Sequence, residues 1–196
     1  MQAAIDHLTA ADPALGEVIR RVGPYTLTPA EEGTHFDALL RSIVYQQLSG
    51  KAAATIHGRV IALMGGCPDP EALLALADEA LRGAGLSRQK VAATRALAER
   101  FVQDPLPADV SHLSDEQLIK ALSSIRGIGR WSAQMFMMFR LGRLDVLPDA
   151  DLGIQKGVMR LDNLDAMPSP KQVVARGQVW RPYATIASWY LWRSLD

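Results

Sequence analysis

Apolar residues recur at helical spacing along almost the whole chain, and this periodicity constrains the fold more than any other feature. From Phe36 to Leu48 the apolar side chains follow the i, i+3, i+4 rule, which is typical of a helix with one buried face. Capping residues, glycines and prolines separate further helical stretches, such as 70–83 and 131–140. Strand-forming runs are scarce and short. We therefore expect an all-α protein of roughly nine or ten helices.

The composition is that of a protein with a sizeable core, at 48% hydrophobic and 21% charged over 196 residues. No apolar run reaches the roughly 18 residues that a membrane helix needs, and the N-terminus lacks the pattern of a signal peptide. Cys67 is the only cysteine, which excludes an internal disulfide and a cysteine-ligated zinc or iron–sulfur site within one chain. The four histidines are scattered without ligand spacing, so we expect no metal site.

The net charge is zero, but basic residues are concentrated in two stretches. Residues 117–143 contain five arginines or lysines and residues 168–195 contain four, with no acid in either stretch. This distribution can place a basic face on a neutral protein, which is a property of nucleic-acid-binding surfaces. A solvated helix surface explains either stretch alone equally well.

The segment LSSIRGIGRWSA at 122–133 joins two expected helices by a tight turn with two glycines. Glycine permits a positive φ and close backbone approach, and the isoleucine between the glycines can anchor the turn in the core. Free N–H groups of the turn and of the next helix then form an anion nest, for which phosphate is the natural ligand. An ordinary helix–turn–helix corner explains an isolated pair of glycines, but the longer pattern favours a phosphate-binding hairpin. Its expected members are Arg126, Gly127, Ile128, Gly129, Arg130 and Ser132.

Several segments together resemble the 3-methyladenine DNA glycosylase II family, the alkylation-repair branch of the helix-hairpin-helix DNA glycosylase superfamily. About twenty residues beyond the hairpin lies the segment PDADLG, at 148–153. The other segments are FDALLRSIVYQQLS at 36–49, GLSRQK at 85–90, WRPY at 180–183 and WYLWR at 189–193. The resemblance covers nearly the whole chain.

The resemblance implies a two-lobed helix-hairpin-helix glycosylase fold without an iron–sulfur cluster. Residues 1–196 would form a single glycosylase domain, with a hairpin-bearing lobe at about 34–143 and a second lobe made of 1–33 and 144–196. No cofactor is expected, although backbone carbonyls of the hairpin can hold a monovalent cation.

The activity implied is that of a monofunctional DNA glycosylase in base excision repair. Such an enzyme flips alkylated bases, such as N3-methyladenine or N7-methylguanine, out of duplex DNA and excises them by hydrolysis. The alternatives are a glycosylase for another lesion and a non-catalytic module that binds distorted DNA. The expected partner is double-stranded DNA with a damaged base, and no membrane. We expect an intracellular monomer, cytoplasmic and nucleoid-associated in a prokaryote.

The resemblance assigns the catalytic role to Asp151, either by activating water or by stabilising positive charge on the sugar. A carboxylate near a breaking glycosidic bond lowers the barrier electrostatically. A simpler interpretation is that Asp151 only caps the helix that begins at Leu152. Asp149 is the rival acid, and Asp151 is preferred because it stands beside Leu-Gly.

Three residues are expected in the pocket for the flipped base: Trp131, Met135 and Trp189. Trp131 occupies the position where bifunctional relatives carry a lysine, so no Schiff base forms and strand incision should be absent. Its aromatic face can stack on a cationic methylated purine. Both tryptophans can alternatively be core residues. Met135 departs from the aromatic residue of well-known family members, which puts the base specificity in doubt.

The resemblance implies that Leu48 is the wedge that fills the gap left by the flipped nucleotide. Gln46 and Gln47 would then reach bases of the opposite strand. The other interpretation is that Leu48 completes the apolar stripe that begins at Phe36.

Overall fold

The computed structural model describes residues 1–30 and 32–196, and all regular secondary structure in these residues is helical. The predicted all-α class is therefore confirmed. The chain forms two compact units. We call Ala30–Phe136 the central unit, and Met1–Pro29 together with Met137–Asp196 the terminal unit. No helix of the described residues is long and apolar enough to cross a membrane.

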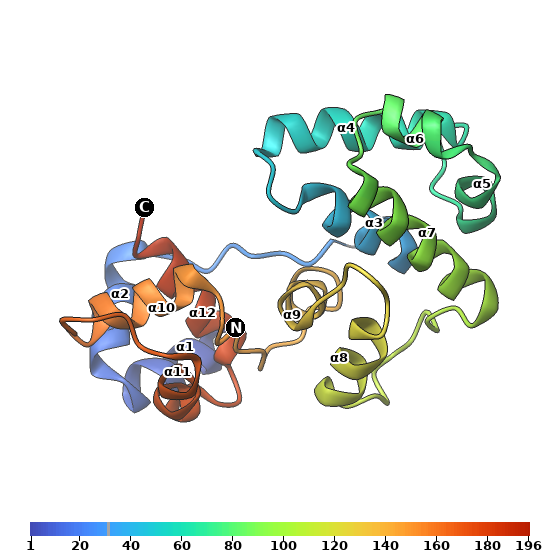
Figure 1. The fold of residues 1–196 in the computed structure, drawn as a ribbon. Coiled ribbons are helices and arrows are strands. Elements are labelled where there is room, and N and C mark those ends of the chain that lie inside the picture. Colours follow the sequence, from blue (N-terminus) through green and yellow to red (C-terminus); the bar gives the residue numbers. More distant parts are fainter. Residues whose placement is uncertain (31) are drawn as a thin grey trace. The chain divides into compact units, whose positions relative to one another are not determined.

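The central unit is built around α3 (His35–Tyr45), which packs against α4 (Gly50–Leu63) and α7 (Arg88–Gln103) (Figure 1). Thr34 starts α3, because its side chain accepts a hydrogen bond from the backbone N–H of Asp37 at 3.1 Å. The apolar face of α3 is buried, as its spacing predicts. The other helices of this unit are α5 (Pro70–Ala75), α6 (Asp78–Gly83), α8 (Asp115–Ser123) and α9 (Arg130–Phe139), whose last residues belong to the terminal unit.

The stretch 70–83 forms two short helices, so the prediction of one helix was wrong. The break follows Leu76, where the guanidinium of Arg95 in α7 provides the donors that a continuous helix would have supplied. Arg95 donates to the carbonyls of Leu74 at 3.3 Å and Leu76 at 2.5 Å. Its Nε also pairs with the Asp78 carboxylate at 2.5 Å, in the first turn of α6. A partner from a distant helix therefore stabilises a break that local periodicity does not reveal.

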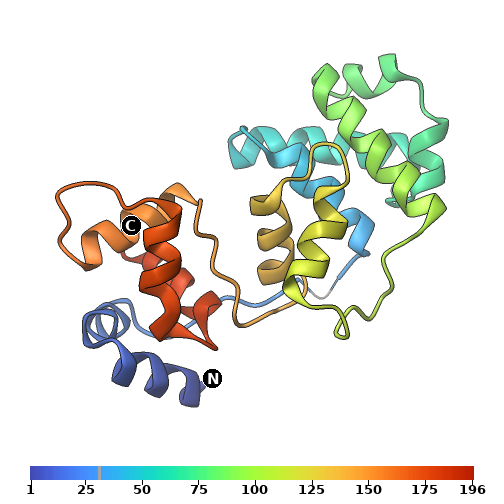
Figure 2. The same ribbon diagram turned by 60° about the horizontal axis from the view of Figure 1, so that its bottom comes forward.

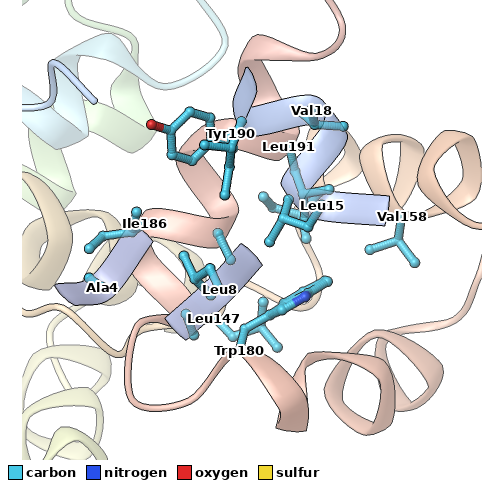
Figure 3. Packing of buried hydrophobic residues seen from close by; sticks show 14 of the residues in the cluster. Ala4, Leu8, Leu15, Val18, Leu147, Val158, Trp180, Ile186, Tyr190 and Leu191 are labelled. Carbon is cyan, nitrogen blue, oxygen red and sulfur yellow. The ribbon is translucent and has the colours of Figure 1, made fainter. Parts of the chain in front are cut away.

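The terminal unit combines the first helices of the chain with the last. α1 (Gln2–Ala11) packs against α2 (Pro13–Val22), and α12 (Ala184–Arg193) packs against α2 and α10 (Leu152–Leu161). The helix α11 (Pro170–Arg176) and the 3-10 helix η1 (Gly177–Trp180) complete the unit. Figure 3 shows how its apolar side chains meet in one core, with Leu8 and Leu15 from the first two helices close to Trp180 and Tyr190.

Asp12 lies between α1 and α2 and connects them to α11 and η1. It is only 4% exposed. Its carboxylate accepts hydrogen bonds from the backbone N–H of Leu15 at 3.1 Å, from Nε1 of Trp180 at 2.8 Å and from Nη2 of Arg176 at 2.7 Å. Burial alone would raise the pKa of Asp12, but the bonds from Trp180, Leu15 and Arg176 outweigh it and lower the pKa. The buried charge is thus paired, and the pairing ties four helical elements together.

Candidate active site

The hairpin consists of α8, the turn at 124–129 and α9, which Figure 2 shows as two neighbouring helices joined by a tight connection. A capping box starts α8, since Ser114 and Gln117 bond each other's backbone N–H. Gly127 has a φ of 87°, and a Cβ there would lie 2.4 Å from the Cβ of Ala93 in α7. Only glycine fits this position. Ile128 is 4% exposed and anchors the turn, as expected.

Gly129 differs from Gly127, because a Cβ added at Gly129 would meet no protein atom within 4 Å. Gly129 is also exposed, so its backbone is accessible from solvent. Arg126 is exposed beside it. Arg130 donates to Glu116 through both terminal nitrogens, at 2.9 and 3.2 Å, and this pairing lowers the pKa of the Glu116 carboxyl. Glu116 lies one residue before the stretch 117–143, which contains no acid. The hairpin thus combines an accessible backbone with an arginine that already has an anionic partner.

Trp131 and Met135 lie one turn apart on α9 and line a cavity of about 380 Å³ within the central unit. Its other lining residues are Ser42, Tyr45, Gln46, Gln47 and Ser132. The Trp131 side chain is 43% exposed, so it is not a core tryptophan. The volume lies within the range of small-ligand sites in proteins. This part of the site presents an aromatic face beside a thioether and several amide and hydroxyl groups.

The turn between α3 and α4, at 46–49, carries the predicted wedge. α3 ends at Tyr45, three residues before Leu48, and the Leu48 side chain is 39% exposed. Leu48 therefore does not complete the buried stripe of α3. Gln46 turns towards the hairpin, and its Nε2 donates to the carbonyl of Gly127 at 3.0 Å and to Oγ of Ser132 at 3.2 Å. The expected contacts of Gln46 and Gln47 with the opposite strand stay predictions.

Ser132, which the sequence assigned to phosphate binding, is only 4% exposed. Its hydroxyl accepts the hydrogen bond from Gln46 and lies on the inner side of the hairpin. The side chain of Ser132 thus contacts protein, whereas the turn backbone at Gly129 is accessible. The monovalent cation that the hairpin carbonyls can hold stays a prediction.

Asp151 is the N-cap of α10 in the terminal unit, as the simpler interpretation expected. Its Oδ1 accepts a hydrogen bond from the backbone N–H of Ile154 at 2.9 Å. The same oxygen accepts a second hydrogen bond from Nε1 of Trp192, also at 2.9 Å. Capping therefore does not account for all of its contacts. The rival acid Asp149 is joined to α10 through its backbone, because its carbonyl accepts a hydrogen bond from Nε2 of Gln155 at 3.2 Å.

Gly153 explains why the segment around Asp151 reads Asp-Leu-Gly. A Cβ at Gly153 would lie 2.7 Å from Cδ1 of Trp192, 2.9 Å from its Nε1 and 3.0 Å from Oδ1 of Asp151. Any larger residue would push the indole away from the carboxylate. The indole of Trp192 is in addition stacked on Phe139, with ring centroids 6.0 Å apart and planes inclined by 21°. Trp192 could not be predicted as a partner of Asp151, because it lies 41 residues away and no spacing rule connects the two.

Trp189 is partly buried and packs against the core of the terminal unit. Its ring meets Tyr25 edge-on at 5.0 Å and Tyr190 at 4.8 Å between centroids. Burial, with a smaller contribution from Tyr190, raises the pKa of Tyr25 to about 12, so Tyr25 remains neutral at physiological pH. The indole of Trp189 therefore has a packing role, and its place in a base pocket stays a prediction. Residues 1–30 and 32–196 contain no group of three His, Cys, Asp or Glu side chains that could hold a metal ion.

Comparisons with known proteins place these features in one family. Residues 40–182 match the HhH-GPD superfamily of base excision DNA repair proteins. The chain is 33% identical over 193 residues to DNA-3-methyladenine glycosylase 1 of Schizosaccharomyces pombe, an alignment that covers 96% of this chain and 85% of that protein.

Two solved structures are similar over nearly the whole chain. The 3-methyladenine DNA glycosylase of S. pombe, in complex with abasic DNA, superposes with a TM-score of 0.85 at 32% identity, covering 98% of this chain and 96% of that one. The DNA-3-methyladenine glycosidase of Bacillus halodurans also gives a TM-score of 0.85, at 39% identity, covering 97% of this chain and 88% of that one.

Proposed function

Because the chain belongs to the HhH-GPD superfamily of base excision DNA repair proteins, we propose that it is a monofunctional DNA glycosylase of the 3-methyladenine type. It excises alkylated bases, such as N3-methyladenine or N7-methylguanine, from duplex DNA by hydrolysis. Its fold is the helix-hairpin-helix DNA glycosylase fold, as the sequence resemblance predicted. The observation that carries the proposal is the Asp151 carboxylate, held by two N–H donors in the Asp-Leu-Gly segment that follows the hairpin.

Asp151 supplies negative charge where the reaction develops positive charge. Breaking an N-glycosidic bond builds oxocarbenium-like charge on the deoxyribose, and a preorganised carboxylate lowers that barrier. Trp192 and Ile154 fix one carboxylate oxygen, so that the orientation of Asp151 is set before the substrate binds. A cationic methylated purine is a good leaving group, and a single carboxylate without a dedicated acid is then sufficient.

Trp131 gives the reaction its monofunctional character. A lysine is absent from this position, so no imine with the sugar forms and the strand stays intact. The exposed face of Trp131, with Met135 beside it, stacks on the flipped base. Stacking on an electron-rich ring favours a base that carries positive charge. Trp189, which packs beside Tyr25 and Tyr190, is the further aromatic residue to which the proposal gives a base-binding role.

The hairpin binds the phosphates of the DNA duplex. The accessible backbone at Gly129 and the side chain of Arg126 bind phosphate, which positions DNA without reading its sequence. Leu48, exposed on the turn between α3 and α4, fills the space of the extruded nucleotide. The two units are the two lobes of one glycosylase domain, which acts as a monomer on double-stranded DNA. As an enzyme that acts on DNA, the protein works in the cytoplasm of a prokaryote, at the nucleoid.

Release of free base tests the proposal. Methylated duplex DNA is incubated with the wild type and with Asp151→Asn, and both the released bases and strand integrity are followed. The proposal expects methylated purines in solution, strands cut only after added alkali, and release that falls to a small residual rate in Asp151→Asn. If base is released only from DNA with another lesion, the assignment of alkylated bases as the substrate is wrong. If the protein binds distorted DNA tightly and releases no base, it is a binding module and not an enzyme.

A further inference from the structure

Lys90, at the beginning of α7, holds the C-terminal end of α3. Its Nζ donates to the carbonyl of Val44 and to the carbonyl of Gln46, both at 2.7 Å. These carbonyls have no helical N–H partner, because α3 ends at Tyr45. An ammonium group satisfies them and also complements the negative end of the helix dipole. Lys90 is half-buried and is not part of the site described above.

Gln46 connects the same point of the chain to the hairpin. Its carbonyl is bound by Lys90, while its side-chain amide donates to the Gly127 carbonyl and to Ser132. The hairpin in turn rests on α7, since Gly127 lies against Ala93, three residues after Lys90. The turn at 46–49 and the hairpin are therefore fixed to each other twice, directly through Gln46 and indirectly through α7.

The contacts of Gln46 lie next to the turn that exposes the Leu48 side chain. Gln47 adopts a left-handed conformation, with a φ of 58°, which is unfavourable for a residue other than glycine. The backbone reverses there, and the next side chain, Leu48, is left exposed. An exposed leucine on an unbraced turn would fold back onto nearby apolar surface. The hydrogen bonds made by the carbonyl and by the side-chain amide of Gln46 oppose such a collapse.

We propose that Lys90 and Gln46 are positioning residues, which hold the wedge Leu48 at a fixed place relative to the phosphates bound by the hairpin. The inference rests on the proposed function for the roles of Leu48 and the hairpin. Lys90 does not touch the DNA. It acts through the backbone of Val44 and Gln46, and its removal affects insertion of the wedge more than binding of undamaged duplex.

The test measures wedge insertion without any chemical step. The probe is a duplex that contains a tetrahydrofuran abasic analogue with 2-aminopurine as the neighbouring base, whose fluorescence rises when the wedge unstacks it. Lys90→Met removes the donors and keeps the length of the side chain, and Lys90→Arg restores donors. Arg88→Met is the matched control, because it removes one exposed positive charge from the same turn of α7. Affinity for undamaged duplex is measured in parallel.

For Lys90→Met we expect the fluorescence change, and kcat on methylated duplex, to fall about tenfold, as for loss of hydrogen bonds from a charged donor. Affinity for undamaged duplex and KM should stay within about twofold, as should every property of Arg88→Met. Lys90→Arg should recover most of the loss. Wild-type fluorescence in Lys90→Met, or an equal loss in Arg88→Met, would overturn the proposal.

Gln46→Met provides the second variant if Lys90→Met does not fold. It removes the bond to the hairpin without touching α7, and it should reduce the fluorescence change by a similar factor. A normal signal in Gln46→Met would overturn the coupling between turn and hairpin. If the wild type raises the fluorescence but releases no base, the glycosylase assignment fails and the positioning role stands. If the wild type releases base while Lys90→Met behaves normally, the positioning role fails alone.

Discussion

Removing a single N–H group from Trp192 isolates its effect on the Asp151 carboxylate, to which the proposal gives the catalytic role. Trp192→Phe deletes the donor to Oδ1 of Asp151 but keeps an aromatic ring that can stack on Phe139. A hydrogen bond to a charged group contributes about 1.5–3 kcal/mol. The retained bond from the backbone N–H of Ile154 places the expected loss at the low end of this range. At about 1.4 kcal/mol per factor of ten in rate, excision should be about tenfold slower.

The assay is single-turnover release of N7-methylguanine from a defined duplex, so that binding and product release do not enter the rate. Trp180→Phe is the control, because it removes an indole N–H that binds another carboxylate of the same unit, Asp12. It should lower the thermal stability and leave the rate of excision unchanged. The decisive comparison is a double-mutant cycle: Trp192→Phe should have no further effect on the residual rate of Asp151→Asn. A wild-type rate in Trp192→Phe, or a tenfold loss that persists in the Asp151→Asn background, would refute the reasoning.

Three further predictions concern stability and packing. Gly127→Ala should lower the free energy of unfolding by about 2 kcal/mol or more, because of the positive φ and the contact with Ala93, and Ala93→Gly should restore part of it in denaturant titrations. Asp12→Asn should cost about 3 kcal/mol at neutral pH. Because the pKa of Asp12 in the folded protein lies below its ordinary value of 3.8, this difference should be present above that pH and shrink as the pH falls further, as urea titrations at several pH values can show. Gly153→Ala should slow base release at least as much as Trp192→Phe while leaving duplex affinity intact, and an unchanged rate would show that the indole tolerates displacement.

The features that the sequence predicted are those that depend on local chemistry. The buried face of α3 follows from apolar spacing. The turn at Gly127 follows from the glycine itself, since few other residues adopt its φ. The family resemblance, whose motifs are spread over nearly the whole chain, is confirmed by the match of residues 40–182 to the HhH-GPD superfamily.

The features that the sequence did not predict depend on contacts between distant residues. The break after Leu76 depends on Arg95, and the orientation of Asp151 depends on Trp192. Lys90 was part of a recognised segment, but its bonds to the end of α3 could not be read from that segment. In each case a long side chain satisfies backbone or carboxylate oxygens elsewhere, and no periodicity or spacing rule describes such a partner.

The discontinuous make-up of the terminal unit has a consequence during synthesis on the ribosome. α1 and α2 are synthesised before the central unit, yet the side chains that cover Leu8 and Leu15, including Trp180 and Tyr190, are added more than a hundred residues later. The central unit can complete its core in the meantime, because all of its residues lie between the two parts. The nascent chain must therefore carry the apolar faces of α1 and α2 without their later partners while its middle folds.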